Sequence, residues 1–330
     1  MDDELKPTSP PGRADPPDRG GSRVVERVIT PQAVMEGAGV RLMRSIATPT
    51  LDYVDPFLLF DHFGSDEPTD YLAGFPWHPH RGIETVTYML AGEVDHRDSI
   101  GNAGRIGPGD VQWMTAGGGI MHEEMPQPGP DRRMGGFQLW VNLPAELKMS
   151  RPRYQDVGAA QIPEVRRDDG TLVRVVAGEV DGVRGAVREI YAAPEYLDVA
   201  LPAGGSFVQP VPRGHTALAY VFVGEGRFGV AGDLGYRGEL DGVLLPAPRM
   251  AVFGDGDVVR VVADTSPVRF LLVSGKPLGE PIARYGPFVM NTREEIRLAL
   301  RDLQDDTFVW RDDPAWERSR RTWSPGTASR

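Results

Sequence analysis

Two short clusters of histidine and glutamate carry the residue types in this sequence that suit metal chemistry. His78 and His80 lie in FPWHPHRGIETVTYML, and His122 and Glu124 lie in GGGIMHEEMP. Within each cluster the partners are two residues apart, so on an extended strand their side chains point to the same face. Two such strands facing each other would offer three imidazoles and one carboxylate. That set suits a divalent transition metal with open positions, and Fe(II) is a natural occupant.

A second carboxylate competes for the same site. Glu84 stands four residues after His80 and shares its parity, so spacing leaves open whether Glu84 or Glu124 completes the ligand set. The order HxH, then Glu, then a later single His resembles the ligand pattern of the cupin superfamily. Glu84 could instead bond to backbone in a barrel wall, and His62 and His96 could line the cavity or lie in surface loops.

The elements that position these residues are predicted to be short strands. The chain has 40 Gly and 30 Pro spread throughout, with runs such as ETVTYMLAG, VQWMTAG and LAYVFVGEG between them. This pattern predicts an all-β fold of sandwiches or small barrels. One helix is predicted from Arg293 to Gln304, packed on a barrel, because Thr292 and Glu295 form a capping-box pattern ahead of an apolar stripe.

An internal repeat predicts two related β-lobes. HRGIETVTYMLAGE matches PRGHTALAYVFVGE 132 residues later, with Arg-Gly, a Tyr and a closing Gly-Glu in register. The candidate ligands of the first lobe fall opposite Pro210, Pro212 and Thr216. The repeat therefore predicts one lobe that binds metal and one that is purely structural.

Length and composition set the domain plan. A chain of 330 residues favours two domains over one core. We predict a disordered arm over residues 1–22, a metal-binding barrel over 23–145, a second barrel with the helix over 146–310, and a surface tail over 311–330.

Charge and residue usage exclude several classes of function. The net charge of −11 argues against general nucleic-acid binding, and the absence of Cys removes thiolate and cysteine-ligated metal sites. There is no apolar run long enough to span a bilayer and no secretory signal. A cytoplasmic protein that binds neither membrane nor nucleic acid is expected.

Longer motifs resemble the pirin family. They are GFPWHPHRGIETVTYML, GDVQWMTAGGGIMHEEMP, QLWVNLP and GKPLGEPIARYGPFVMNTREEI, and the match runs from about Val24 to Trp323. The resemblance implies two tandem jelly-roll-like cupin barrels with a C-terminal helix packed on them. It implies iron in the first barrel, bound by the residues that match the family's ligands: His78, His80, His122 and Glu124. Trp77 and Gly118 depart from the usual family pattern, at the rim rather than at the ligands.

The resemblance implies two classes of function. Several pirins act as quercetin 2,3-dioxygenases, which implies a flavonol-like substrate and O₂. Fe²⁺ would acidify the substrate hydroxyl while Glu124, or else Glu84, accepts the proton, and the ring would open with release of carbon monoxide. Zn²⁺, Ni²⁺, Mn²⁺ or Cu²⁺ could also occupy such a site. Other pirins act as iron redox sensors that bind a transcription factor or metabolic enzyme, which implies a regulatory protein partner and little catalysis. A monomer is expected in both cases.

Overall fold

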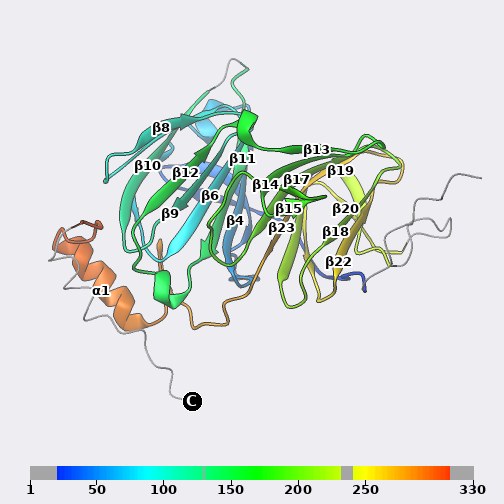
Figure 1. Cartoon of the computed structure of the whole chain (residues 1–330). Coiled ribbons are helices and arrows are strands. Elements are labelled where there is room, and N and C mark those ends of the chain that lie inside the picture. Colours follow the sequence, from blue (N-terminus) through cyan, green and yellow to red (C-terminus); the bar gives the residue numbers. More distant parts are fainter. Residues whose placement is uncertain (1–20, 129–130, 232–240, 313–330) are drawn as a thin grey trace, which may run out of the picture.

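The first lobe consists of two packed β-sheets. The computed structural model describes residues 21–128, 131–231 and 241–312, and Figure 1 shows two β-lobes side by side. One sheet of the first lobe has the strand order β12-β9-β6-β11-β4-β3-β2, and the other has the order β5-β10-β7-β8. The strands are β2 (Gln32–Glu36), β3 (Val40–Ile46), β4 (Phe57–Ser65), β5 (Phe75–His80), β6 (Ile83–Ala91), β7 (Glu93–Asp98), β8 (Ala103–Ile106), β9 (Val111–Thr115), β10 (Ile120–Gln127), β11 (Met134–Asn142) and β12 (Arg153–Val157).

The second lobe is one ten-stranded sheet that curls around its own apolar core. Its main path is β1-β21-β19-β23-β17-β14-β13, with β18, β20 and β22 paired alongside. The strands are β1 (Val25–Ile29), β13 (Glu164–Arg166), β14 (Leu172–Ala177), β17 (Glu195–Leu201), β18 (Ser206–Pro210), β19 (Thr216–Phe228), β20 (Val243–Pro246), β21 (Arg249–Phe253), β22 (Val258–Val262) and β23 (Val268–Gly275). A small hairpin, β15 (Glu179–Val180) with β16 (Val183–Arg184), completes the lobe.

The predicted all-β fold with one C-terminal helix is confirmed. Helix α1 (Arg293–Gln304) follows the hairpin β24 (Ala283–Tyr285) and β25 (Phe288–Met290). Its capping box is formed as predicted, because Thr292 accepts from the Glu295 backbone N–H while the Glu295 carboxylate accepts from Thr292 N. None of the helices in the described part of the chain has the length and apolar character needed to cross a bilayer. The predicted arm and tail lie almost wholly outside the described residues.

The N-terminal strand of the described chain packs on the second lobe, and the C-terminal helix packs on the first. Strand β1 pairs with β21 of the second lobe, whereas α1 lies beside the first lobe in Figure 1. Lys148 links the C-terminal segment to the first lobe. Its buried ammonium donates to Asn142 Oδ1, Gly82 O and Val289 O at 2.7–3.0 Å. The predicted boundary at 145/146 assigned both ends by chain order alone, so it misses this exchange.

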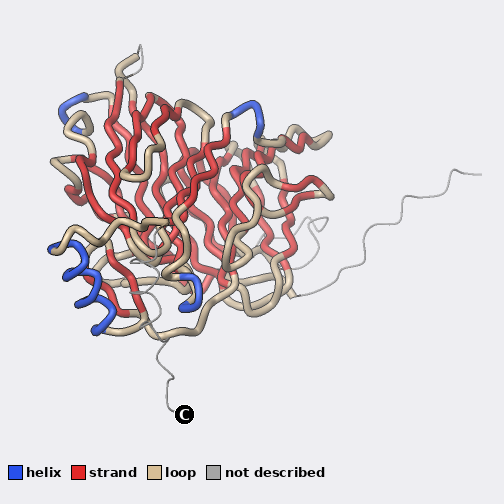
Figure 2. The backbone as a smooth tube through the Cα atoms, turned by 60° about the vertical axis from the view of Figure 1, so that its left-hand side comes forward, coloured by secondary structure: helices blue, strands red, loops and turns tan. Residues whose placement is uncertain are grey.

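A shared apolar core joins the lobes. The seven-stranded sheet of the first lobe and the ten-stranded sheet of the second pack against each other through one cluster of buried residues. Figure 2 shows the strands running through the middle of the molecule, with the helical segments at its edges. Tyr220 of β19 meets Phe60 and Phe137 of the first lobe with ring centroids 4.8 and 5.8 Å apart. The second lobe therefore supports one face of the seven-stranded sheet, and the opposite face of that sheet faces the metal-site residues.

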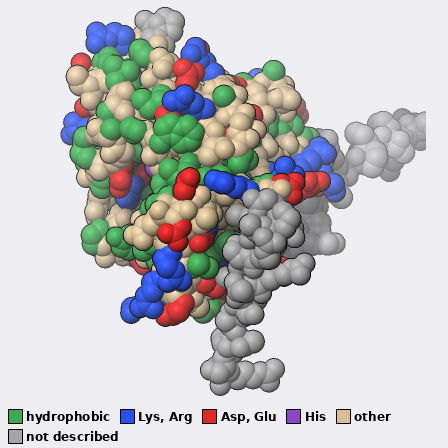
Figure 3. Space-filling view, turned by 90° about the vertical axis from the view of Figure 1, so that its left-hand side faces the viewer, with side chains coloured by type: hydrophobic (Ala, Val, Ile, Leu, Met, Phe, Trp, Pro, Cys, Tyr) green, Lys and Arg blue, Asp and Glu red, His purple; other side chains and the backbone are tan. Residues whose placement is uncertain are grey.

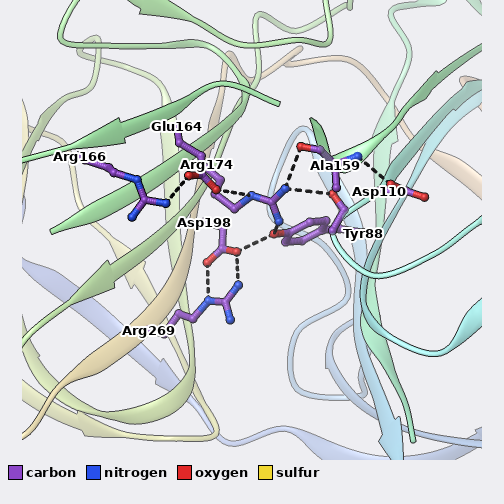
Figure 4. Close-up of polar contacts among 9 residues, drawn as sticks. Tyr88, Asp110, Ala159, Glu164, Arg166, Arg174, Asp198 and Arg269 are labelled. Carbon is purple, nitrogen blue, oxygen red and sulfur yellow. Dashed lines mark hydrogen bonds and ion pairs between the residues drawn. The ribbon is translucent and has the colours of Figure 1, made fainter. Parts of the chain in front are cut away.

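A buried polar network crosses the same interface. Asp198 is paired bidentately with Arg269 at 2.9 and 2.6 Å, and its Oδ2 accepts from the Tyr88 hydroxyl at 2.6 Å (Figure 4). Arg174 donates to the Tyr88 hydroxyl at 3.2 Å and reaches Gly109 O and Ala159 O in the first lobe. Charge-assisted bonds of this kind are stronger than neutral ones, so the network aligns β6 against the second lobe.

Removing the Tyr88 hydroxyl should therefore destabilise the protein. We expect Tyr88→Phe to lower the free energy of unfolding by about 1–3 kcal/mol, because Asp198 loses one buried donor. Tyr196→Phe is the matched control, since its buried hydroxyl has no hydrogen-bond partner among the described residues. Denaturant unfolding of both variants checks this, and equal loss in the two would show that the hydroxyl bond is not the cause.

Candidate metal centre

The pairing of β5 with β10 brings the two histidine clusters together. The strands are antiparallel, and His122 lies directly opposite His78, while His80 lies opposite Ile120. Directly opposed residues share a face, and residues two apart on one strand share it as well. The register therefore gathers His78, His80 and His122 on one side of the four-stranded sheet.

The three imidazoles form a tight group. Their ligand atoms lie within 4.8 Å of one another, and this is the single group of three or more such side chains found in the described residues. The ring centroids are 4.3–5.0 Å apart. Three rings this close cannot all carry a proton without strong repulsion, so the arrangement favours neutral nitrogens with lone pairs aimed at a common point.

Burial and hydrogen bonding keep these lone pairs available. Burial, and next the nearby imidazoles, hold the pKa values of His80 and His122 well below the usual range. His78 Nδ1 lies 2.9 Å from Pro76 O, and a carbonyl can only accept, so Nδ1 carries the proton and Nε2 keeps a lone pair. Both nitrogens of His122 are buried without a hydrogen-bond partner in the described structure. A divalent metal fits this donor set, because neutral imidazole is the form that binds it.

Glu124 lies beside the histidines on the same cavity wall. It follows His122 by two residues on β10, and its Oε1 is 3.2 Å from Thr87 Oγ1. The same hydroxyl is 2.7 Å from Gln138 Oε1, so Thr87 connects strands β6, β10 and β11. The carboxylate lies outside the tight histidine group, near the Thr87 hydroxyl, whose single proton can go to only one of these two oxygens at a time.

Glu84 lies on the other face of β6. Shared parity with His80 left open that Glu84 also faces the metal, but a turn at Arg81 and Gly82, where Gly82 has φ +81°, separates β5 from β6 and resets the alternation. Glu84 is fully buried toward the interface core, where Oε1 accepts from Thr115 Oγ1 at 2.7 Å. Burial raises its pKa to about 7.

The two other first-lobe histidines also lie away from the cavity wall. His62 on β4 faces the second lobe, where its Nδ1 is 3.1 Å from the Tyr220 hydroxyl, and burial lowers its pKa to about 4. His96 on β7 is buried against Tyr154, with ring centroids 6.0 Å apart. Both pack against aromatic side chains in this arrangement.

The glycine run before the ligand strand is a tight turn. Gly117 and Gly119 have φ values of +49° and +143°. A side chain at Gly117 would strike the backbone of Ser150, and one at Gly119 would strike the backbone of Phe308. Glycine at these positions therefore lets β10 start beside the C-terminal segment.

A cavity of about 530 Å³ opens beside the histidine group. Its walls are mostly apolar, with Val40, Leu42, Phe63, Phe75 and Trp140 among them. Figure 3 views the molecule from this side, where histidine is visible in a recess among hydrophobic and charged side chains. An apolar slot next to metal-ligating side chains suits a planar aromatic ligand.

Several residues of this cavity were missed by sequence reasoning. Thr87 and Gln138 sit at strand positions that read as ordinary sheet residues, and Arg284 follows the second lobe, about 200 residues beyond the histidines. The motif GKPLGEPIARYGPF was the one available signal for Arg284, because it stood out among the segments that resemble a known family.

The described residues of the second lobe contain no equivalent of the histidine group. Pro210 ends β18 and Thr216 begins β19, at the positions that the repeat aligns with His78 and Glu84. Its interior is filled by apolar side chains that include Phe207, Phe228 and Phe270. Apolar side chains thus fill the described interior of this lobe, and its purely structural role stays a prediction.

The fold and site together define a protein of the bicupin class, with two tandem cupin barrels and a histidine cluster in the first. The chain belongs to the pirin family: the Pirin model matches residues 39–141 and the Pirin C-terminal cupin domain model matches residues 196–309.

Similar proteins come from distant organisms. The chain is 47% identical to a pirin-like protein of Caulobacter vibrioides over 87% of this chain and 99% of that one, and 41% identical to pirin of Homo sapiens over 87% and 94%. A crystal structure of quercetin 2,3-dioxygenase from Acinetobacter baumannii superposes with a TM-score of 0.76 at 34% identity, covering 87% of this chain and 98% of the other.

Proposed function

We propose that this protein is a metal-dependent dioxygenase that opens a flavonol-like ring with O₂ and releases carbon monoxide. The observation that carries the proposal is the convergence of three histidines beside an apolar cavity. The likeness to the A. baumannii quercetin 2,3-dioxygenase supports the same reaction class. We propose His78, His80, His122 and Glu124 as the metal ligands and Fe²⁺ as the working ion.

The protein's own residues would orient the substrate and take up its proton. A bound divalent metal supplies Lewis-acid polarisation of the substrate hydroxyl. Glu124 lies beside the histidines and is the carboxylate that would take up the released proton. Trp140, whose ring meets His80 edge-on with centroids 5.1 Å apart, positions the aromatic plane, and the apolar walls exclude water.

Turnover by freshly loaded protein tests the proposal. Protein loaded anaerobically with Fe(II) should consume quercetin with equimolar O₂ uptake and release of carbon monoxide, and elemental analysis should find one metal ion per chain. Metal-free protein prepared with a chelator is the control and should show no turnover.

Two other outcomes would redirect the assignment. A metal-loaded protein that turns over no flavonol, yet binds a protein partner differently as Fe(II) and Fe(III), would replace the dioxygenase with a redox-sensing regulator. Failure to bind any transition metal above trace level would overturn both functions.

A further inference from the structure

Arg284 is a charged residue in the cavity wall that the proposed reaction does not use. It belongs to strand β24, which crosses from the second lobe onto the first. Its Nη1 donates to Leu58 O at 3.1 Å, and its Nε lies 3.5 Å from Gly286 O. A guanidinium has five N–H donors, so these two contacts leave the two N–H groups of Nη2 available in a residue that lines the cavity.

No carboxylate in the described part of the chain pairs with Arg284. The other guanidinium of the wall, Arg44, is fully paired, because Asp61 binds it bidentately at 2.8 and 2.7 Å and Glu36 adds a contact at 2.6 Å. Asp61, Glu36 and Asp52 act on Arg284 from beyond ion-pair distance. Burial lowers the pKa of Arg284, which means that its charge is poorly solvated there.

The position of Arg284 links it to the metal end of the cavity. Because its Cζ lies 5.2 Å from the Trp140 ring centroid, and that centroid lies 5.1 Å from the His80 ring, Arg284 is at most about 10 Å from His80. The cation stacks on Trp140, so the guanidinium plane is fixed beside the slot. A fixed, partly desolvated fork of donors is the arrangement that binds an anionic oxygen best.

We propose that Arg284 selects aromatic substrates that carry an anionic oxygen group at the end remote from the metal. One end of such a molecule presents its hydroxyls to the histidine group, its ring lies along Trp140, and its acidic group pairs with Arg284. This inference rests on the proposed function, since it assumes that an oxygenated aromatic occupies the cavity. It narrows the substrate class from any planar flavonol-like compound to aromatic acids or strongly acidic phenols.

The test compares two ligands that differ in one charge. Caffeic acid has a catechol at one end and a carboxylate at the other, and its methyl ester has the same shape without the charge. Zinc-loaded protein keeps the site occupied without redox turnover. By titration calorimetry the wild type should bind the acid at least about 10-fold more tightly than the ester, and Arg284→Gln should bring the ratio to about 1.

Three controls test whether a lost preference for the acid in Arg284→Gln comes from the loss of the guanidinium. Arg284→Lys keeps the charge without the planar fork and should retain part of the preference, and it provides a folded variant if the glutamine change disturbs the Leu58 contact. Arg105→Gln removes one exposed charge from the same lobe and should leave the ratio unchanged. Zinc content, measured for every variant, should remain one ion per chain, because Arg284 is not a ligand.

The outcomes distinguish this inference from the function on which it rests. If Arg284→Gln retains the wild-type preference, the acid is recognised elsewhere, for example by the metal, and the role of Arg284 is overturned while the site stands. Equal binding of acid and ester by the wild type overturns it as well. If neither ligand binds the zinc-loaded wild type, the proposed oxygenated-aromatic site fails together with the inference.

Discussion

His122→Ala is expected to remove the metal and, with it, more than about 100-fold of any flavonol turnover. His122 is opposite His78 in the strand pairing, is 1% exposed, and has two buried nitrogens without a hydrogen-bond partner among the described residues. Without His122, two imidazoles of the group and the proposed ligand Glu124 remain. Elemental analysis after dialysis and oxygen uptake with quercetin measure the two effects.

His62→Ala is the matched control for this variant. It also removes a buried histidine from the first lobe, but one that contacts Tyr220 at the interface rather than the histidine group. Its metal content should equal that of the wild type even if its stability falls. Full metal retention in His122→Ala, or equal loss in both variants, would contradict the assignment of His122 as a ligand.

Glu84→Gln should change the pH dependence of stability. Burial raises the pKa of Glu84 from an ordinary 4.5 to about 7. The folded protein therefore binds a proton at this position that the unfolded chain has already released, so wild-type stability falls as pH rises from about 4.5 to 7. That loss amounts to about 3 kcal/mol above pH 7, and glutamine, which does not titrate, removes it.

The measurement is the difference in unfolding free energy between variant and wild type as a function of pH. Both proteins should be metal-free, so that metal binding does not contribute its own pH dependence. The difference should shift in favour of the variant by about 3 kcal/mol between pH 4.5 and pH 8. A difference that is constant with pH would show that Glu84 titrates normally, and a loss of turnover with metal retained would give Glu84 the catalytic role that its parity suggested.

Local patterns were sufficient for the strands, the helix and the histidine pairs. Period-two spacing placed His78 with His80 and His122 with Glu124, because side-chain alternation is a property of one strand. The helix bounds were predictable because the Thr292 capping box and the apolar stripe are both local signals. The same rule failed for Glu84, because the turn at Gly82 breaks the strand on which alternation depends.

By itself the sequence determined the all-β architecture, the lobe that retains the histidines and their common face, since these follow from periodicity and from the internal repeat. Spacing left Glu84 and Glu124 open and the family resemblance favoured Glu124, whereas only the tertiary structure decided that Glu84 faces the interface and which residues close the cavity. The reason is that strand register and the exchange of terminal segments depend on packing between distant parts of the chain. Arg284 reaches Trp140 only because β24 crosses to the first lobe, and Glu84 turns to the interface because β6 packs against the second.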